Sequence, residues 1–428
     1  MGQLKDGGYE ITANESDADV IVVNTCGFIE SAKQESIGAI LDATRLKSEG
    51  KAKRVVVAGC LVERYRDDLI KELPEVDAFI GTNQINEILK ASDEAENFKD
   101  FALPSIGNKS ATYIYNETTP RLRATDSHTA FIKIAEGCDR PCAFCSIPGM
   151  RGSFRSRPFG SILKEAENLA EQGVKEVVLI AQDSSRYGED LGKVDALANL
   201  VRALGEIKDL EWVRVMYAYP THISDAFLSA IAETPKVVKY LDMPLQHASR
   251  NVLRLMKRGG NRESLEKLIR RVREKIPGIT IRTTFITGFP GEAEEDFEEL
   301  MAFVRNCNFD NVGVFTYSDE EGTAAYDLPD KVDAKTAKQR RARLMKEQAK
   351  ISRRKNFSKI GNVYRVLFEG NSPESDLLWH GRLEGQAREI DGYILINDAP
   401  EQLKPQIGEF YNVRITEAHN YDLIGEIV

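Results

Sequence analysis

The sequence predicts an α/β protein in three parts: an N-terminal parallel α/β sheet, a central, partly open barrel of six strand–helix units, and a small C-terminal β-barrel. In residues 1–93, apolar β-branched runs alternate with helical stretches, which indicates a parallel sheet. The same alternation starts again near residue 130 and occurs six times, which indicates a barrel. After residue 357 the pattern changes to short β-runs divided by turn residues, which is typical of an all-β barrel.

The N-terminal part, residues 1–93, is expected to hold three parallel strands. The strands are expected at Asp19–Cys26, Arg54–Cys60 and Ala78–Gly81, with helices at Ile29–Ala43 and Arg64–Leu73. Parallel strands end at the same edge of a sheet, and ligands bind at that edge. Because the first two strands each end in a cysteine, we expect their thiols to share one crevice.

Residues 94–126 are polar and irregular, and we interpret them as a linker. Residues 127–356 are predicted to form the barrel and a connecting helix. The barrel strands are expected at Phe131–Ala135, Glu176–Ala181, Val213–Tyr217, Val238–Asp242, Thr280–Ile286 and Asn311–Phe315. Helical spacing covers Ile162–Gln172, Ser249–Lys257, Glu292–Asn306 and Ala334–Phe357. In a barrel of parallel strands, the chemistry lies on the loops that follow the strands.

The C-terminal part, residues 357–428, is predicted to be a small β-barrel and is acidic. Its strands are expected at Tyr364–Glu369, Gly392–Ile396, Phe410–Glu417 and Leu423–Val428. The part contains 12 Asp and Glu residues against 6 Lys and Arg residues. A net-negative domain is a poor clamp for nucleic acid and a good docking surface for a basic protein.

Composition and charge exclude several classes of protein. No run of about 18 apolar residues exists, so we expect no membrane span, and the N-terminus lacks the apolar core of a signal peptide. We therefore expect a cytoplasmic protein. The formal net charge of −9 argues against strong nucleic-acid binding. Six cysteines in a reducing compartment indicate metal or redox chemistry rather than a disulfide framework.

Three of the cysteines form a compact motif directly after the first expected barrel strand. The segment Gly137–Ile147 reads GCDRPCAFCSI, with the spacing Cys-x3-Cys-x2-Cys. Three thiolates on one short loop can hold three irons of a cubane cluster and leave the fourth iron open for a ligand. A structural zinc site would need four ligands, and a disulfide would leave one thiol over. The spacing therefore favours an iron–sulfur cluster.

This motif, with Phe144 before the last cysteine, resembles the radical S-adenosylmethionine (SAM) superfamily. Much more of the chain is similar to one branch, the methylthiotransferases. NTCGFIESAKQES and AGCLVERY resemble its N-terminal cluster domain. LIAQDSSRYG, DMPLQHAS and TTFITGFPGE resemble its barrel, and the last part resembles its TRAM domain. QDSSRYG, YSDEEGT and ITEAHNYDLIGEIV are most similar to the branch that modifies an aspartate of small-subunit ribosomal protein number twelve.

The resemblance implies two 4Fe–4S clusters and SAM as cofactors. Cys138, Cys142 and Cys145 are expected to be catalytic and to hold the cluster that cleaves SAM. Cys26 and Cys60 are expected to hold the second cluster, which presents the sulfur. The family uses three cysteines for that cluster, and the first of them has no counterpart here. Either the sequence is truncated at its start, which we expect, or the protein lacks a strand and a ligand. The reaction converts a C–H bond at the aspartate β-carbon into C–S–CH3.

The resemblance also suggests further contacts to the cofactors. Phe144, Gln182, Asp183, Gly288 and Gly291 are the expected cofactor-binding residues. Some of them have simpler explanations. The segment around Asp183 can be a helix cap, and the two glycines can form a strand-to-helix turn.

Two more groups of polar residues allow two interpretations each, and one further thiol has a single interpretation. His247 lies at the expected active face, where a lone histidine is more often structural than catalytic. Glu320 and Glu321 can face the substrate or only water. Cys307 is expected to be a packed core thiol.

The expected partners are a small-subunit ribosomal protein as substrate and a flavodoxin-type electron donor. The first alternative function is methylthiolation of a tRNA adenosine, which the acidic C-terminal part disfavours. The second alternative is a non-catalytic iron–sulfur factor that binds RNA or the ribosome, since a small β-barrel can bind RNA. The three-cysteine loop argues against this alternative, because structural clusters use four ligands.

Overall fold

The computed structural model describes residues 1–93, 113–123 and 127–428, and most of the expected linker 94–126 lies outside this range. The chain forms two compact units. The first contains Met1–Ala124, Glu136–Arg155 and Ser318–Asp327. The second contains Thr125–Ala135, Ser156–Tyr317 and Leu328–Val428. The three-cysteine loop therefore belongs to the same compact unit as the N-terminal sheet.

The first unit is built on a parallel sheet in the order β1-β2-β3, as predicted. Its strands are β1 (Val20–Thr25), β2 (Arg54–Gly59) and β3 (Ala78–Ile80). Its helices are α1 (Gly2–Asp6), α2 (Glu30–Ser48), α3 (Cys60–Glu72), α4 (Ile88–Ser92) and α5 (Ile147–Arg151). The valines of β2 are fully buried, because helices pack on both faces of the sheet and only apolar, β-branched residues suit such a strand. The ends of β1 and β2 are in register, with Thr25 opposite Gly59.

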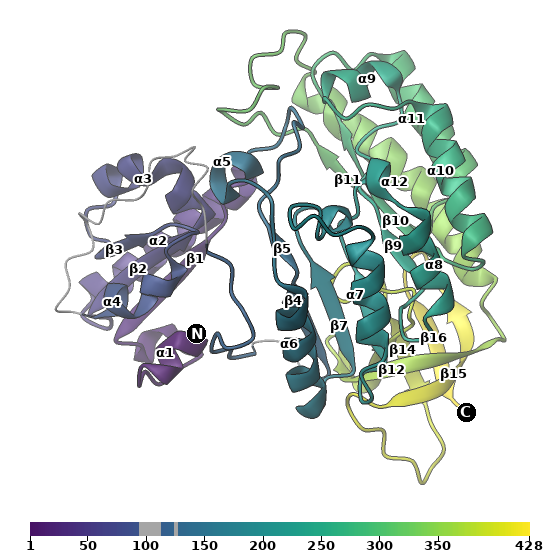
Figure 1. The fold of residues 1–428 in the computed structure, drawn as a ribbon, viewed down its shortest axis with the longest axis horizontal. Helices are drawn as coiled ribbons and strands as arrows, with labels where there is room; N and C mark the ends of the chain where they lie inside the picture. Colours follow the sequence, from purple (N-terminus) through teal and green to yellow (C-terminus); the bar gives the residue numbers. More distant parts are fainter. Residues whose placement is uncertain (94–112, 124–126) are drawn as a thin grey trace. The chain divides into compact units, whose positions relative to one another are not determined.

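The second unit contains the predicted six parallel barrel strands (Figure 1). They are β4 (Thr129–Lys133), β7 (Glu176–Ile180), β8 (Trp212–Val215), β9 (Tyr240–Asp242), β10 (Thr280–Thr287) and β11 (Asn311–Thr316). They form two parallel sheets, β4-β7-β8 and β9-β10-β11, which a bridge between Val213 and Val237 joins. Among the described strands no pairing joins β4 to β11, so the barrel is open.

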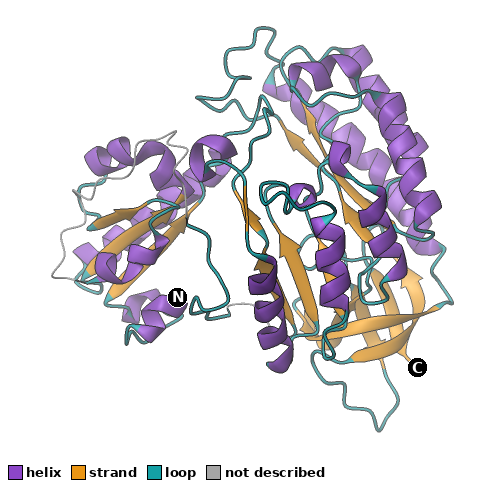
Figure 2. Cartoon of the chain, in the orientation of Figure 1, coloured by secondary structure: helices purple, strands orange, loops and turns teal. Residues whose placement is uncertain are grey.

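Helices follow the barrel strands and cover their outer side (Figures 1 and 2). They are α6 (Phe159–Glu171), α7 (Ala196–Gly205), α8 (Asp225–Glu233), α9 (Arg250–Leu255), α10 (Arg262–Lys275), α11 (Glu294–Cys307) and the long α12 (Ala334–Phe357). Two short strands, β5 (Ala135–Glu136) and β6 (Arg155–Ser156), flank the three-cysteine loop. Cys307 is buried at the end of α11, as expected for a core thiol, and burial raises its pKa to about 12.

The C-terminal residues form a closed barrel in the order β12-β13-β14-β16-β15 (Figure 2). The strands are β12 (Val363–Ser372), β13 (Ser375–Arg382), β14 (Ile394–Asp398), β15 (Phe410–Ala418) and β16 (Leu423–Ile427). The sequence predicted only four of these strands and missed β13. The reason is that Leu377 in β13 is 92% exposed, so its apolar residues do not follow the expected inside–outside alternation.

A buried ion network fixes this small barrel to the strands of the larger one. Arg382 from β13 contacts Glu176 of β7 at 2.6 Å and Glu369 of β12 at 3.0 Å. Glu176 also pairs with Arg214 at 2.8 Å, and Glu369 pairs with His128 at 3.0 Å. Burial would raise the pKa of Glu176, but the two arginines lower it to about 2. The charges are therefore held together at the N-terminal end of β7.

Candidate iron–sulfur sites and cofactor face

The three-cysteine loop is held tightly at its first residue. Gly137 has a φ of +81°, and a Cβ there would lie 2.2 Å from the carbonyl oxygen of Ser153, so only glycine fits. The next residue, Cys138, donates its backbone N–H to the carbonyl of Gly152 at 3.1 Å. Cys138 is buried, whereas Cys142 and Cys145 are half-buried. The loop therefore presents two of its three sulfurs near the surface of a rigid turn.

The donor set of this loop is three thiolates, which is the ligand type that iron–sulfur clusters take. None of the six cysteines is in a disulfide. In the part of the chain that the structure describes, no three His, Cys, Asp or Glu side chains gather around one point as ligands of a single ion do. Thiolates of a cubane cluster bind different irons and need no common point. The backbone N–H of Arg140 points at the Cys138 sulfur at 3.4 Å, and such bonds favour a thiolate ligand.

Cys26 and Cys60 lie at neighbouring strand ends in the same unit. Each directly follows the paired residues Thr25 and Gly59, and a Cβ on Gly27 would lie 2.9 Å from the carbonyl oxygen of Cys60. Cys26 is exposed and Cys60 is buried. Burial raises the pKa of Cys60, and the nearby Cys26 raises it further. The topology of the parallel sheet thus brings together two thiols that are far apart in the sequence.

The segment Ser318–Asp327 is anchored beside these cysteines by a buried carboxylate. Glu320 is only 2% exposed and pairs with Lys33 at 3.1 Å and Arg64 at 2.8 Å. Arg64 also donates to the carbonyl of Gly27 at 2.8 Å. Glu320 therefore serves to hold the segment in place. Glu321 is exposed, and its backbone carbonyl accepts a hydrogen bond from Arg64.

The loop after β7 carries two of the expected cofactor-binding residues. Asp183 is the N-cap of the short helix Ser184–Arg186 and accepts from the Ser185 backbone N–H at 3.2 Å. Its simpler interpretation as a cap thus has structural support. Gln182 differs, because its buried Oε1 has no hydrogen-bond partner among the described residues. A buried acceptor without a donor is costly, so Gln182 is well suited to bind a ligand.

Gly288 and Gly291 form a tight turn at the C-terminal end of β10. Both have positive φ, +78° and +80°. A Cβ on Gly288 would lie 2.3 Å from the Cβ of Ala337 in α12, so packing within the chain already requires glycine there. The carboxylate of Glu292 closes the turn by accepting the backbone N–H groups of Gly288 and Phe289. A cofactor contact at the two glycines stays a prediction.

Glu292 is a functional candidate that the sequence interpretation missed, although it ends the TGFPGE motif. Burial raises its pKa to about 7, while Arg340, 3.3 Å away, acts to lower it. His247, in the loop after β9, is fully buried, and burial lowers its pKa to about 3. Its Nδ1 accepts from the backbone N–H of Ser249 at 3.0 Å, so its Nε2 carries the proton and has no partner among the described residues. His247 is therefore a neutral donor rather than an acid.

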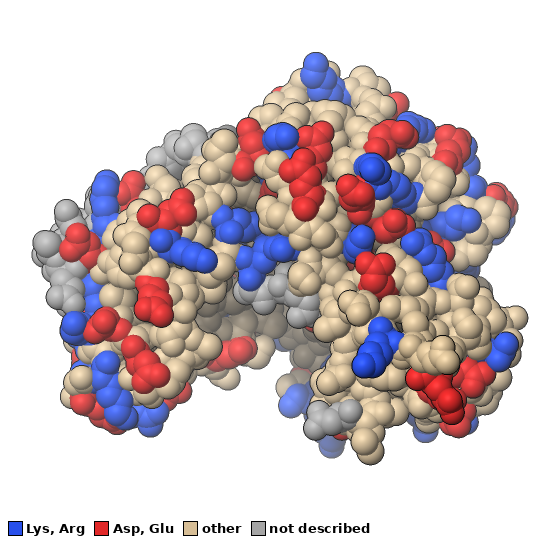
Figure 3. Space-filling model, turned by 90° about the horizontal axis from the view of Figure 1, so that it is seen from below, with Lys and Arg blue, Asp and Glu red and all other residues tan. Residues whose placement is uncertain are grey.

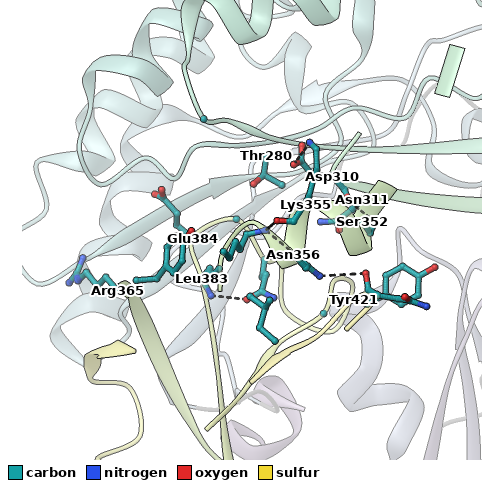
Figure 4. A pocket seen from close by; sticks show the side chains of 18 of the residues that line it. Thr280, Asp310, Asn311, Ser352, Lys355, Asn356, Arg365, Leu383, Glu384 and Tyr421 are labelled. Atoms are coloured by element: carbon teal, nitrogen blue, oxygen red, sulfur yellow. Dashed lines mark hydrogen bonds and ion pairs between the residues drawn. The ribbon is translucent and has the colours of Figure 1, made fainter. Parts of the chain in front are cut away.

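The cavity shown in Figure 4 lies at the other end of the barrel strands. It has a volume of about 400 Å³ and is lined by the first residues of three strands, Trp212, Thr280 and Asn311. Lys355 reaches across it to Asp310 at 2.6 Å (Figure 4). Because chemistry in parallel barrels lies at the strand C-termini, this cavity is not the cofactor face.

Comparison with known proteins assigns each part of the chain. The model of the radical SAM superfamily matches residues 132–304, the model described as uncharacterized protein family UPF0004 matches residues 1–81, and that of the TRAM domain matches residues 360–428. A radical SAM methyltransferase, TsrM from Kitasatospora setae with a SAM analogue bound, shares the fold with a TM-score of 0.53 at 15% identity. The match covers 70% of this chain and 62% of that one. The fold and the cysteine loop define a radical SAM enzyme.

Curated relatives identify the branch. Ribosomal protein uS12 methylthiotransferase RimO from Solibacter usitatus is 50% identical over 430 residues, covering 100% of this chain and 90% of the relative. The proteins of the same name from Koribacter versatilis and Myxococcus xanthus are each 46% identical, covering 100% of this chain and 92% and 88% of theirs. The chain belongs to the radical SAM methylthiotransferase family. It is a transferase, and this family implies a 4Fe–4S cluster and SAM.

The described residues contain no helix that is both long and apolar enough to span a membrane.

Proposed function

We propose that this methylthiotransferase modifies a uS12-type ribosomal protein by converting a C–H bond at the β-carbon of an aspartate into C–S–CH3. The observation that carries the proposal is the agreement along the whole chain with enzymes that bear this name, at 50% identity in one case. All three parts take part in that agreement, including the C-terminal barrel. A tRNA substrate is the alternative that the experiment below tests.

We assign the SAM-cleaving cluster to Cys138, Cys142 and Cys145. Bound there, a 4Fe–4S cluster supplies the electron that cleaves SAM, and the resulting radical can take a hydrogen from an unactivated C–H bond. The chain contributes the three thiolates, the rigid turn at Gly137 and the backbone N–H of Arg140 near a sulfur. Gln182 offers an acceptor to a polar group of SAM.

We assign a second 4Fe–4S cluster to Cys26 and Cys60. Their position at neighbouring strand ends supports this role, since both thiols reach one edge of the sheet. The third cysteine that the resemblance implies has no counterpart among the six of this chain. Both assignments place sulfur ligands in one compact unit, which suits a reaction that needs a radical and a sulfur donor together.

The charge distribution supports a basic protein as substrate. The C-terminal part has 12 acidic and 6 basic residues, and three of its bases, Lys359, Arg382 and Arg388, are buried or half-buried. On the face in Figure 3, acidic and basic side chains of the described residues are interspersed without a continuous basic stripe. We propose that the enzyme binds no nucleic acid strongly, receives electrons from a flavodoxin-type protein and works in the cytoplasm.

The test compares two substrates under the same conditions. The anaerobically reconstituted protein is incubated with SAM, a reductant and either purified uS12 or tRNA, and the products are analysed by mass spectrometry. We expect one methylthio group on an aspartate of uS12 and none on tRNA. The Cys138→Ala/Cys142→Ala/Cys145→Ala variant is the control and should modify neither. Methylthiolated tRNA with unchanged uS12 would overturn the proposed substrate.

A further inference from the structure

The segment 250–275 is strongly basic, although the chain as a whole is acidic. It holds ten Lys and Arg residues against three Asp and Glu residues, in a chain with a formal net charge of −9. The segment forms α9, α10 and the turn between them (Figure 1). Seven of the ten bases are exposed, namely Arg250, Arg254, Lys257, Lys267, Arg270, Arg271 and Lys275. Local positive charge of this density attracts a negatively charged partner.

Several of these charges are not neutralised within the chain. Lys257, Lys267 and Arg270 form no ion pair with any residue that the structure describes. Arg271 lies 3.9 Å from the carboxylate of Asp225, and both side chains are exposed. Ion pairs between exposed side chains are weak. The positive charge of this segment therefore faces the solvent and is available to a partner.

A groove of about 360 Å³ runs along one face of α10. Its wall on this helix has the spacing of a single helical face, with Ser264, Lys267, Leu268 and Arg271. Three buried leucines line its floor, namely Leu245, Leu253 and Leu265. All of the charged residues that line it are basic, namely Arg258, Lys267 and Arg271. The groove therefore combines an apolar floor with a positive rim.

The groove lies at the end of the barrel strands where we propose that SAM binds. Pro220 and Thr221, which follow β8, and Leu245, which follows β9, all line the groove. Gln182 follows β7 in the same way. Because parallel strands of a barrel end on the same side, a protein that docks in the groove stands beside the proposed cofactor face.

The lining of the groove favours an acidic protein over a nucleic acid. Sites for single-stranded nucleic acid stack the bases on aromatic side chains, and none of the described residues that line the groove is aromatic. A leucine floor suits an apolar side chain of a protein partner, and the basic rim suits carboxylates around it. A basic substrate protein would be repelled by the same rim. Among the partners proposed above, only the electron donor is then suited to this groove.

We propose that this groove, with Lys267 and Arg271 at its rim, is the docking site of an acidic electron-donor protein. The proposal rests on the electron donor and the SAM-cleaving cluster proposed above. One electron passes from the reduced donor to the oxidised cluster, and no bond is made or broken in this step. Opposite charges speed the encounter of the two proteins, while a small contact area allows the spent donor to leave.

The test compares two ways of delivering the electron. The reconstituted protein receives SAM and either reduced flavodoxin or dithionite, without a protein substrate, and the release of 5′-deoxyadenosine is measured. Lys267→Glu/Arg271→Glu reverses two charges of the rim. Lys267→Glu alone is the second variant, because Arg271 also donates to the carbonyl of Ile223 at 2.7 Å. The matched control, Lys338→Glu/Lys346→Glu, reverses two exposed charges of the equally basic α12.

At low flavodoxin concentration, we expect Lys267→Glu/Arg271→Glu to lower the flavodoxin-driven rate about 10-fold and to make it less sensitive to salt, because electrostatic steering is lost. Lys267→Glu should lower this rate less. The dithionite-driven rate and both rates of the control should stay as in the wild type.

Three results would overturn the docking site: an unchanged flavodoxin-driven rate in both rim variants, an equal loss in the control, or an equal loss with dithionite in Lys267→Glu. If the rim variants weaken binding of small-subunit ribosomal RNA and leave the flavodoxin-driven rate unchanged, the groove binds nucleic acid and the proposal is wrong. A wild type that cleaves SAM with dithionite but not with flavodoxin would overturn the donor. Failure with both would instead overturn the SAM-cleaving cluster, on which the proposal rests.

Discussion

The two ends of strand β7 are built in opposite ways. At its start, the buried charge of Glu176 is matched by Arg382 and Arg214, and these ion pairs join the two barrels. Just beyond its other end, Gln182 keeps a buried acceptor without a partner among the described residues. The first arrangement pairs the buried carboxylate of Glu176 with two arginines within the chain, which stabilises the fold. The second leaves binding capacity for a ligand. The start of β7 therefore contributes to stability, whereas the residue just after its end is available to bind a ligand.

The three-cysteine loop is expected to contribute to the reaction and not to the stability of the fold. In the Cys138→Ala/Cys142→Ala/Cys145→Ala variant, we expect SAM cleavage to fall to background, because the loop after the first barrel strand holds no other thiol. The midpoint of urea unfolding of the metal-free protein should stay close to that of the metal-free wild type, since two of these thiols are only half-buried. Release of 5′-deoxyadenosine is measured by chromatography. Residual SAM cleavage above background would show that these cysteines are not the catalytic site.

The opposite result is expected at the junction of the barrels. Arg382→Met removes the cation between two buried carboxylates, Glu176 and Glu369. Breaking a buried pair in this way costs about 3–5 kcal/mol of unfolding free energy. The control is Arg414→Met in the same small barrel, where the Glu426 pair at 2.9 Å is exposed and worth about 0–1 kcal/mol. Urea unfolding measures both. Equal effects of the two substitutions would show that the network is not the main tie between the barrels.

The same contrast explains what the sequence could predict. The barrel strands were predicted within a few residues, for example Asn311–Phe315 against the observed Asn311–Thr316, because apolar periodicity is a local property. The Cys138–Cys145 loop could be proposed as a cluster site for the same reason, since its spacing is local. Strand β13 was missed because Leu377 is exposed. Strand β13 pairs with its sequence neighbours β12 and β14, whereas the barrel is closed by the pairing of β12 with the distant β15, which no local pattern reveals.

The site residues that were missed depend on contacts between distant segments. Glu292 was passed over because its burial beside Arg340 follows from the packing of α12. Glu320 was left with two interpretations because its partners, Lys33 and Arg64, come from the other end of the chain. Sequence spacing finds groups that act within one loop, and only the fold shows which charges meet.

The pH dependence of the unfolding free energy tests the raised pKa of Glu292 at the proposed cofactor face. Its pKa is raised from 4.5 to about 7 in the folded protein, so the folded state binds more protons between these values. Its contribution to stability is complete below pH 4.5 and is lost as the pH rises through 7. A shift of this size corresponds to about 3 kcal/mol.

In Glu292→Gln, we expect the fall in unfolding free energy between pH 5 and pH 8 to become shallower by roughly this amount, since Gln keeps an acceptor for Gly288 and Phe289 but does not titrate. Urea unfolding at a series of pH values measures the slope. The control is Glu321→Gln, an exposed carboxylate whose replacement should leave the slope as it is. Parallel slopes for the wild type and Glu292→Gln would mean that Glu292 is ionised in the folded protein throughout this range.

The smallest expected effect brings the comparison back to β7. Gln182→Ala removes the acceptor that has no partner in the described part of the chain, so stability should change little while SAM binding weakens about 2- to 10-fold, the value of one hydrogen bond. Equilibrium dialysis with the reconstituted protein measures the dissociation constant. Gln172→Ala is the matched control, because Gln172 is exposed at the C-terminal end of α6, shortly before β7 begins. If Gln182→Ala lowers stability and leaves SAM affinity intact, Gln182 has a structural role like that of Glu176. His247 would then be the remaining candidate for ligand binding on this face.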